Sequence, residues 1–229
     1  FAKNRKVEYY NKDIALVNIR TNPDNQIFRA MDDDEDIRIL AEDIKRNGLM
    51  HNLVVFPEQE EGSAVYVLLS GERRFRALNY LQEKGDATWN IVNCNVVTTP
   101  LTENEKKVLL YSANLQVRGG FSDEAIRRQA IAEFITCLQR EPYNMSREEA
   151  LNATKIVSTV NPRTIERDAR IEEKLKGKLK TLLNDKFLTR SECETYLRFE
   201  ADKQDEIANR FEKLQAVDCH SDDTESAGK

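Results

Sequence analysis

The sequence predicts an α+β protein in which a mixed α/β N-terminal domain precedes an all-α domain. Up to about residue 100, apolar runs rich in β-branched residues alternate with segments whose apolar residues recur every three or four positions. These are the signals of strands and amphipathic helices. Beyond Leu101 every strong signal is helical, so strands are expected only in the first half.

The boundary between the domains is expected at Arg118-Gly119-Gly120, where paired glycines interrupt two helical patterns. We therefore assign residues 1–118 to the N-terminal domain and 119–215 to the helical domain. Residues 216–229 are predicted to be a disordered tail or linker, because their polar composition buries too little surface to order them.

Composition restricts the class of protein. The 229 residues carry a net charge of -5 and include no apolar run close to the roughly 20 residues of a membrane-spanning helix. No secretory signal is recognisable, so we expect a cytoplasmic protein. The negative charge argues against a globally basic nucleic-acid binder, so any contact with DNA must be local. The four cysteines have no C-x-x-C spacing, and we expect neither structural zinc nor disulfides.

The N-terminal domain is expected to begin with a strand at 14–19, which the turn-forming residues 22–25 end. A helix follows between Asp33, a candidate N-cap, and Gly48, a candidate C-cap. Continuous apolar runs predict two buried strands at 53–56 and 65–69. A second helix is expected from 72 to 84, then a strand at 89–97.

The second half is predicted to contain capped helices. In a capping box, a hydroxyl side chain and the glutamate three residues later each bond the other's backbone N–H. Such boxes begin at Thr102, Ser146 and Thr189.

Residues 146 to about 180 have the proportions of a helix-turn-helix. The helical pattern breaks at residues 159–161, and Asn161 and Pro162 suit the N-cap and first position of a second helix. That helix is the candidate DNA reader, because 163–180 holds seven basic and four acidic residues. Its candidate DNA-binding residues are Arg163, Thr164, Arg167, Arg170 and Lys174. The alternative is a solvated helix with internal ion pairs.

Another candidate site lies where the strand ending at Leu69 meets the helix from Glu72. The turn Ser70-Gly71 places unpaired backbone N–H groups and the positive end of a helix dipole at one point, which favours an anion. Arginines at positions 73, 74 and 76 add charge-assisted donors. Alternatively, these arginines solvate a surface helix and pair with Glu72 or the acidic loop before the strand.

The motifs, in their order along the chain, resemble the ParB partition-protein family. Gly71-Glu72-Arg73-Arg74-Phe75-Arg76-Ala77 after a strand is similar to the signature box of that family. Three further stretches resemble the remaining family motifs: Asn22-Pro23 with Gln26 and Arg29, the helix end and strand within 40–55, and Asn114-Leu115-Gln116. The similarity covers roughly residues 14–214, and residues 146–150 resemble the start of the family's helix-turn-helix.

The resemblance implies a homodimer that binds double-stranded DNA in chromosome or plasmid partition. It further implies CTP with Mg²⁺ as cofactors that gate clamp formation or spreading, a ParA-like ATPase as partner, and a location on the nucleoid or a plasmid. Carried over position by position, the nucleotide-binding residues are Gly48, Leu49, Gly71, Glu72, Arg73, Arg74, Arg76 and Asn114.

The chain departs from the family pattern at three positions. Ala113 stands where the family has a glutamate implicated in metal binding and hydrolysis, Val117 where it has an arginine, and Asn52 where it has a proline. Loss of the carboxylate removes a natural oxygen ligand of Mg²⁺. The sequence therefore predicts CTP binding with weak or absent hydrolysis, and it assigns no catalytic residue or metal ligand.

Two other classes of function stay open. A ParB-like transcriptional regulator with a vestigial nucleotide site is one, and Ala113 favours it. A nuclease or serine kinase on the same fold is the other, with Ser70 and Glu72 as the kinase groups to inspect. A sulfiredoxin-like enzyme is disfavoured, because the turn has Ser70 and Gly71 where a reactive cysteine would stand.

Overall fold

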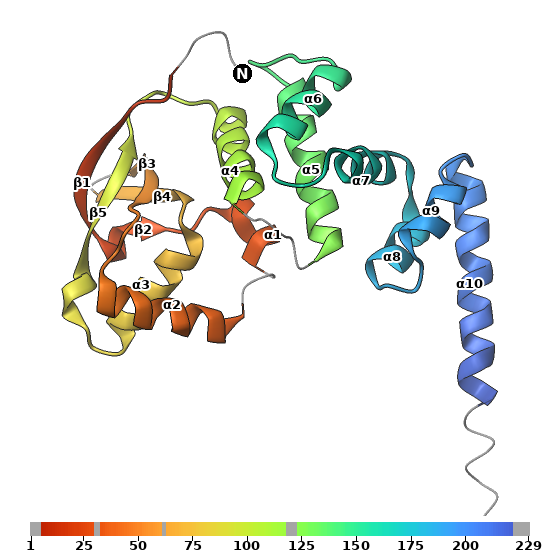
Figure 1. Cartoon of the computed structure of the whole chain (residues 1–229), viewed down its shortest axis with the longest axis horizontal. Coiled ribbons are helices and arrows are strands. Elements are labelled where there is room, and N and C mark those ends of the chain that lie inside the picture. The colour runs from red at the N-terminus through yellow and green to blue at the C-terminus, as the bar shows by residue number, and fades with distance from the viewer. Residues whose placement is uncertain (1–5, 30–32, 61–62, 118–122, 222–229) are drawn as a thin grey trace, which may run out of the picture.

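The computed structural model describes residues 6–29, 33–60, 63–117 and 123–221. A five-stranded sheet with its covering helices forms one end of the molecule, and a series of helices leads from it to the long helix α10 (Figure 1). The predicted α+β class, with a mixed sheet followed by helices, is confirmed. No helix within these described ranges is long and apolar enough to cross a membrane.

The sheet has the strand order β1-β5-β3-β4-β2. Its strands are β1 (Tyr9–Ala15), β2 (Ile19–Arg20), β3 (Leu53–Glu60), β4 (Ser63–Ser70) and β5 (Ile91–Val97). The pairs β1/β5 and β3/β4 are antiparallel, whereas β3/β5 and β2/β4 are parallel. The two buried strands predicted at 53–56 and 65–69 are the centre of this sheet.

Helices cover both faces of the sheet. The helices α2 (Asp34–Asn47) and α3 (Glu72–Glu83) share a core with Tyr66 and Leu68 of β4. The alternate residues Val67 and Leu69 share a second core with α4 (Glu103–Val117). A strand buried on both faces needs apolar residues at every position, which explains the continuous apolar run that predicted it.

The strand predicted at 14–19 is wrong in its extent. The strand β1 begins at Tyr9 and ends at Ala15, and a 3-10 turn (Leu16–Asn18) separates it from β2. Its first five residues are exposed, because β1 pairs with β5 alone and lies at the edge of the sheet. Residues 9–13 therefore lack the apolar pattern that would have revealed them. The strand predicted from 89 begins instead at Ile91, after the 3-10 turn Ala87–Asn90.

The described C-terminal half is helical, as predicted. Its helices after α4 are α5 (Glu124–Gln139), α6 (Arg147–Val157), α7 (Pro162–Lys174), α8 (Gly177–Asn184), α9 (Arg190–Tyr196) and α10 (Ala201–Ser221). Two short elements, η2 (Pro23–Asn25) and α1 (Gln26–Arg29), lie in the N-terminal half. All three predicted capping boxes form. At the start of α4, for example, Thr102 N–H donates to Glu105 Oε2 at 2.7 Å and Glu105 N–H donates to Thr102 Oγ1 at 3.2 Å.

The core on the α4 side of the sheet continues into the C-terminal helices. Val67, Leu110, Phe134 and Ile165 belong to one buried cluster that joins β4, α4, α5 and α7. The predicted boundary at 118–120 lies outside the described residues, and the division into two domains stays a prediction. The predicted tail is partly helical, since α10 continues to Ser221. Each residue added to an existing helix gains one hydrogen bond, so polar residues at the end of α10 can continue the helix.

A buried ionic network holds α7 against its neighbours. Asp168 is fully buried, and its Oδ2 accepts a hydrogen bond from Arg127 Nε of α5 at 2.7 Å. Arg190 of α9 lies 3.8 Å from the other oxygen of Asp168. Next to it, Arg128 is 2% exposed and donates to Asn184 Oδ1 of α8 at 2.6 Å. Burial lowers the pKa of Arg128.

Three cysteines are buried core residues. Cys94, Cys137 and Cys193 lie in three different apolar clusters. Burial raises the pKa of the Cys94 and Cys193 thiols to about 11. At neutral pH these two side chains are therefore protonated and act as small hydrophobic groups.

Candidate functional site: a turn at the start of α3 and an exposed face of α7

The turn between β4 and α3 depends on Gly71. Its φ of 105° is in the region that L-residues with a side chain rarely adopt. A Cβ at this position would lie 2.8 Å from Leu53 Cδ2 and 3.2 Å from an Arg74 terminal nitrogen. Gly71 therefore allows the turn to pack directly against Leu53 at the beginning of β3.

Arg74 fastens this turn to the loop between α2 and β3. Its Nη1 donates to the Asn52 carbonyl at 3.0 Å and also to the His51 carbonyl. Burial lowers the pKa of Arg74. The same loop begins at Gly48, whose N–H bonds the Ile44 carbonyl at 2.8 Å and whose φ is 79°. The second family motif and the signature box therefore lie side by side.

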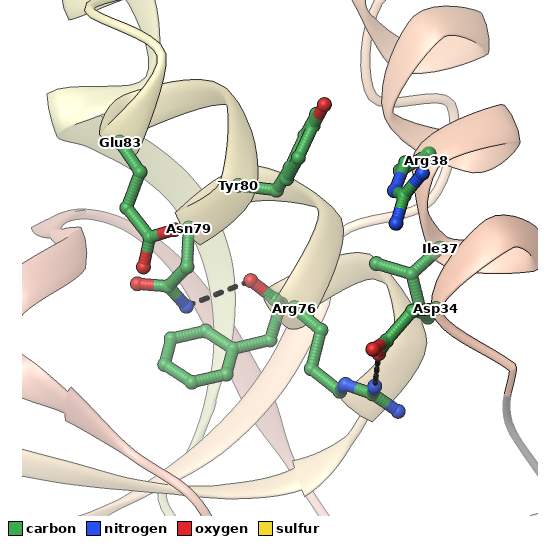
Figure 2. A pocket seen from close by; sticks show the side chains of 8 residues that line it. Asp34, Ile37, Arg38, Arg76, Asn79, Tyr80 and Glu83 are labelled. Carbon is green, nitrogen blue, oxygen red and sulfur yellow. Dashed lines mark hydrogen bonds and ion pairs between the residues drawn. The ribbon is translucent and has the colours of Figure 1, made fainter.

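Arg73 and Arg76 face the acidic first turn of α2. Arg76 Nη2 donates to Asp34 Oδ1 at 3.0 Å, and Arg73 Nη2 lies 4.0 Å from Asp36 Oδ2. Figure 2 shows Arg76 directed at Asp34 across a groove of about 430 Å³ between α2 and α3. These acids come from α2, which packs against α3, whereas the sequence alternative had named Glu72 or the acidic loop as partners.

Phe75 and Ala77 of the box belong to the core on the α3 side of the sheet, whereas Glu72 is a buried charged residue. Glu72, Phe75 and Ala77 are buried, and Leu49 packs against the cluster under α2 and α3. The arginines at 73, 74 and 76 therefore alternate with residues that fix α3 on the sheet.

The first and third family motifs pack against each other. Asn22 Oδ1 accepts from Asp24 N–H at 2.9 Å, which shapes the turn that buries Asn25. From α4, Asn114 Nδ2 lies 3.5 Å from Asn25 Oδ1 and donates to the Leu110 carbonyl at 2.9 Å. The side chains of two further motif positions, 29 and 117, lie outside the described residues. Asn114 is thus placed beside the turn at 22–25.

The residues that the structure describes include no group of three or more His, Cys, Asp or Glu side chains arranged to hold a metal. Position 113 on α4 offers only a methyl group. A nucleotide-bound Mg²⁺ usually takes one or two protein carboxylates in addition to phosphate oxygens and water.

The helices α6 and α7 and the short turn between them occupy the segment in which the sequence predicted a helix-turn-helix. Asn161 Oδ1 accepts from Arg163 N–H at 2.9 Å, and Pro162 is the first residue of α7. In the turn, Ser158 Oγ accepts from Val160 N–H at 3.1 Å, and Thr159 N–H donates to the Leu115 carbonyl of α4 at 3.3 Å. Local hydrogen bonds thus replace the glycine usual in such a turn.

The candidate DNA-binding residues of α7 differ in what they contact. Arg163 and Lys174 are exposed at its two ends, and Thr164 is half-buried. Arg167 and Arg170 instead form ion pairs with Glu194 of α9. Sequence reasoning missed Glu194, because nothing in the local pattern connects it with a helix more than twenty residues earlier.

Comparison with known proteins agrees with the fold described above. Residues 2–105 match the profile of the ParB N-terminal domain. No curated protein matches the sequence. The C2221 crystal form of a Pnob8-like ParB N-domain shares 11% identity over 90% of this chain and 98% of its own, with a TM-score of 0.51. The C-terminally truncated chromosome-partitioning protein ParB of Caulobacter crescentus, complexed with CTP-γ-S, shares 19% over 88% and 98%, with a TM-score of 0.37.

The sheet and three of the four motifs lie within the matched residues, whereas Asn114-Leu115-Gln116 lies beyond them. The signature box lies within residues 2–105, at the turn that leads from β4 into α3. The N-terminal part of the chain, residues 2–105, is thus similar to the ParB N-terminal domain.

Proposed function

We propose that this protein is a site-specific DNA-binding protein of the partition type that binds CTP at the start of α3. The observation that carries the nucleotide part is the Gly71 turn, which Arg74 holds against the loop that begins at Gly48. Within a ParB N-terminal domain, this places two predicted nucleotide-binding segments around one point. The choice of CTP among nucleotides rests on the family resemblance.

The residues of the turn suit a triphosphate. Backbone N–H groups at the start of α3 can donate to phosphate oxygens, and Arg73, about half exposed, can add a charge-assisted bond. Without a nucleotide, Arg73 lies near Asp36 and Arg76 pairs with Asp34, and these solvent-exposed ion pairs are weaker interactions. Arg74 acts through the loop, because its Nη1 is already bonded to two carbonyl groups.

Replacing Arg73 with alanine is expected to weaken CTP binding at least about tenfold, the effect of one lost bond to a charged group. Isothermal titration calorimetry with CTP, ATP and GTP, with and without duplex DNA, measures this. Arg210→Ala is the matched control, because Arg210 is an exposed arginine of α10 paired with Glu206 of the same helix. Native protein that binds none of the three nucleotides would contradict the nucleotide site and leave the regulator with a vestigial site.

The DNA part of the proposal rests on α7. Its N-terminal end exposes Arg163, which has no ion pair within 4 Å among the side chains described. The N-terminal residues of the second helix in this motif contact base edges, while neighbouring basic residues meet phosphates. A homodimer, a ParA-like ATPase partner, clamp formation and a location on the nucleoid or a plasmid stay predictions from the family.

Arg163→Ala is expected to weaken binding to duplex DNA about tenfold and to reduce the slope of log K against log salt concentration by about one, because one charged contact is lost. Fluorescence anisotropy at several salt concentrations measures both quantities, again with Arg210→Ala as the control. If the native protein binds no duplex at low salt, α7 is not a DNA reader.

One observation favours a second function, that of a DNA-binding regulator without nucleotide turnover. Position 113 lacks the carboxylate that the family resemblance calls for, and α4 offers a methyl group there. Phosphate release from CTP in the presence of DNA discriminates: turnover that Arg73→Ala abolishes supports a CTPase, whereas binding without turnover supports the regulator.

A further inference from the structure

We propose that Glu194 limits the affinity of this protein for DNA, because its carboxylate occupies two arginines of α7 at a position where a DNA phosphate would bind. This inference rests on the proposed function of α7 as the DNA reader. It concerns a residue of α9 that belongs to none of the motifs above.

The carboxylate of Glu194 is shared between two turns of α7. Its Oε2 lies 2.6 Å from Arg167 Nη2, and its Oε1 lies 2.5 Å from Arg170 Nη2. Arg167 Nη2 also donates to Ser191 Oγ of α9 at 3.1 Å. Both oxygens of one carboxylate are thus used by the two arginines that sequence analysis assigned to DNA.

These contacts border a hollow of about 480 Å³ that has an excess of positive charge. The hollow is lined by four arginines, two glutamates and one leucine: Arg147, Arg163, Arg167, Arg170, Glu166, Glu194 and Leu151. The hollow lies beside the exposed N-terminal end of α7. A phosphate of the DNA backbone has the charge and the oxygen geometry that arginines bind in bidentate fashion.

The pairing with Glu194 is incomplete, and solvent reaches it. Arg167 Nε is buried and has no hydrogen-bond acceptor among the described residues. The side chains of Arg167, Arg170 and Glu194 are 30%, 52% and 27% exposed. Exposed ion pairs are weak, so a phosphate with several oxygens can displace the carboxylate. Each displacement has to overcome the existing bonds, which lowers the affinity for DNA.

The test is Glu194→Gln, measured with a pool of random-sequence duplex DNA, since charge contacts of this kind do not depend on sequence. We expect binding about five- to tenfold tighter than that of the native protein at the same salt concentration, as two released surface ion pairs would give. The slope of log K against log salt concentration is expected to stay close to that of the native protein, because the same arginines meet phosphates once the Glu194 carboxylate has been displaced.

Glu206→Gln is the matched control. Glu206 also binds two basic side chains, Lys203 and Arg210, but both belong to α10. This variant removes the same charge and reports the gain that comes from net charge alone. In the background Arg167→Ala/Arg170→Ala, Glu194→Gln is expected to give no gain beyond that of the control, because the arginines that it releases are absent.

The following results overturn the inference. A gain equal to that of Glu206→Gln means that only net charge acts, and weaker binding by Glu194→Gln means that Glu194 positions the arginines for DNA. A full gain in the Arg167→Ala/Arg170→Ala background places the effect elsewhere. If neither the native protein nor Glu194→Gln binds any duplex at low salt, the proposed DNA-binding function is wrong. If the native protein binds DNA but Glu194→Gln shows no gain, only the proposed role of Glu194 is wrong.

Discussion

Asp168→Asn is expected to destabilise the protein by about 3 kcal/mol, because it removes the carboxylate to which the largely buried Arg127 is hydrogen-bonded and leaves Arg127 only Glu124, 3.8 Å away. Asp168 is fully buried, and the side chain of Arg127 that it binds is only 11% exposed. Arg128, next along α5, is buried as well. Without the carboxylate, two adjacent guanidinium groups would lie in the core of α5, α7 and α8. Urea unfolding followed by circular dichroism measures the loss.

Two comparison variants separate burial from charge. Glu166→Gln removes a carboxylate from an exposed position of the same helix, where it pairs with Lys155, and should leave the unfolding midpoint almost unchanged. The double variant Arg127→Met/Asp168→Leu removes both charges and should be much more stable than Asp168→Asn, since apolar side chains replace buried pairs at little loss. An Asp168→Asn variant as stable as Glu166→Gln would show that water reaches the network.

The ends of the helices could be predicted, because the signals that set them are local. Asp33 accepts from Glu35 N–H at 3.0 Å, and Ser146 and Asn161 accept from amides two or three residues away. Residue type and spacing along a few positions are sufficient for such bonds. The start of α7 at Pro162, after the N-cap Asn161, followed from the same kind of signal.

The features that the sequence did not reveal depend on distant partners. The polar residues of β1 form a strand because β5, more than eighty residues later, pairs with them, as Tyr9 does with Val97. Asp168 and Arg127 are charged, and a charged residue is normally expected at the surface. Only packing of α5 against α7 makes this pair part of the core.

The candidate site shows the same division. Gly71 and the arginines after it were recognisable from residue type and from the strand before them. Which arginine stays available to a ligand was not, because Arg74 bonds carbonyl groups of a loop more than twenty residues earlier. The acids that meet Arg73 and Arg76 lie on α2, and their proximity follows from the packing of two helices on one face of the sheet.

Gly71→Ala is expected to abolish nucleotide binding and to destabilise the protein by about 2 to 3 kcal/mol. A left-handed backbone costs an alanine roughly 1 to 2 kcal/mol. The added Cβ would also lie 2.8 Å from Leu53 Cδ2, a distance that forces the turn or β3 to move. Either movement shifts the first N–H groups of α3 and the Arg74 contacts that hold the loop. Calorimetric titration with CTP and urea unfolding measure the two effects.

Gly85→Ala is the control that isolates the close approach. Gly85 follows α3 and has a φ of 88°, but a Cβ there would meet no atom within 4 Å. It should therefore show the backbone strain alone, roughly 1 to 2 kcal/mol, with CTP affinity unchanged. Equal losses of stability in both variants would mean that the contact with Leu53 relaxes easily. Retained CTP binding in Gly71→Ala would mean that the start of α3 does not hold the phosphates, since the N–H groups there cannot keep their positions around a displaced turn.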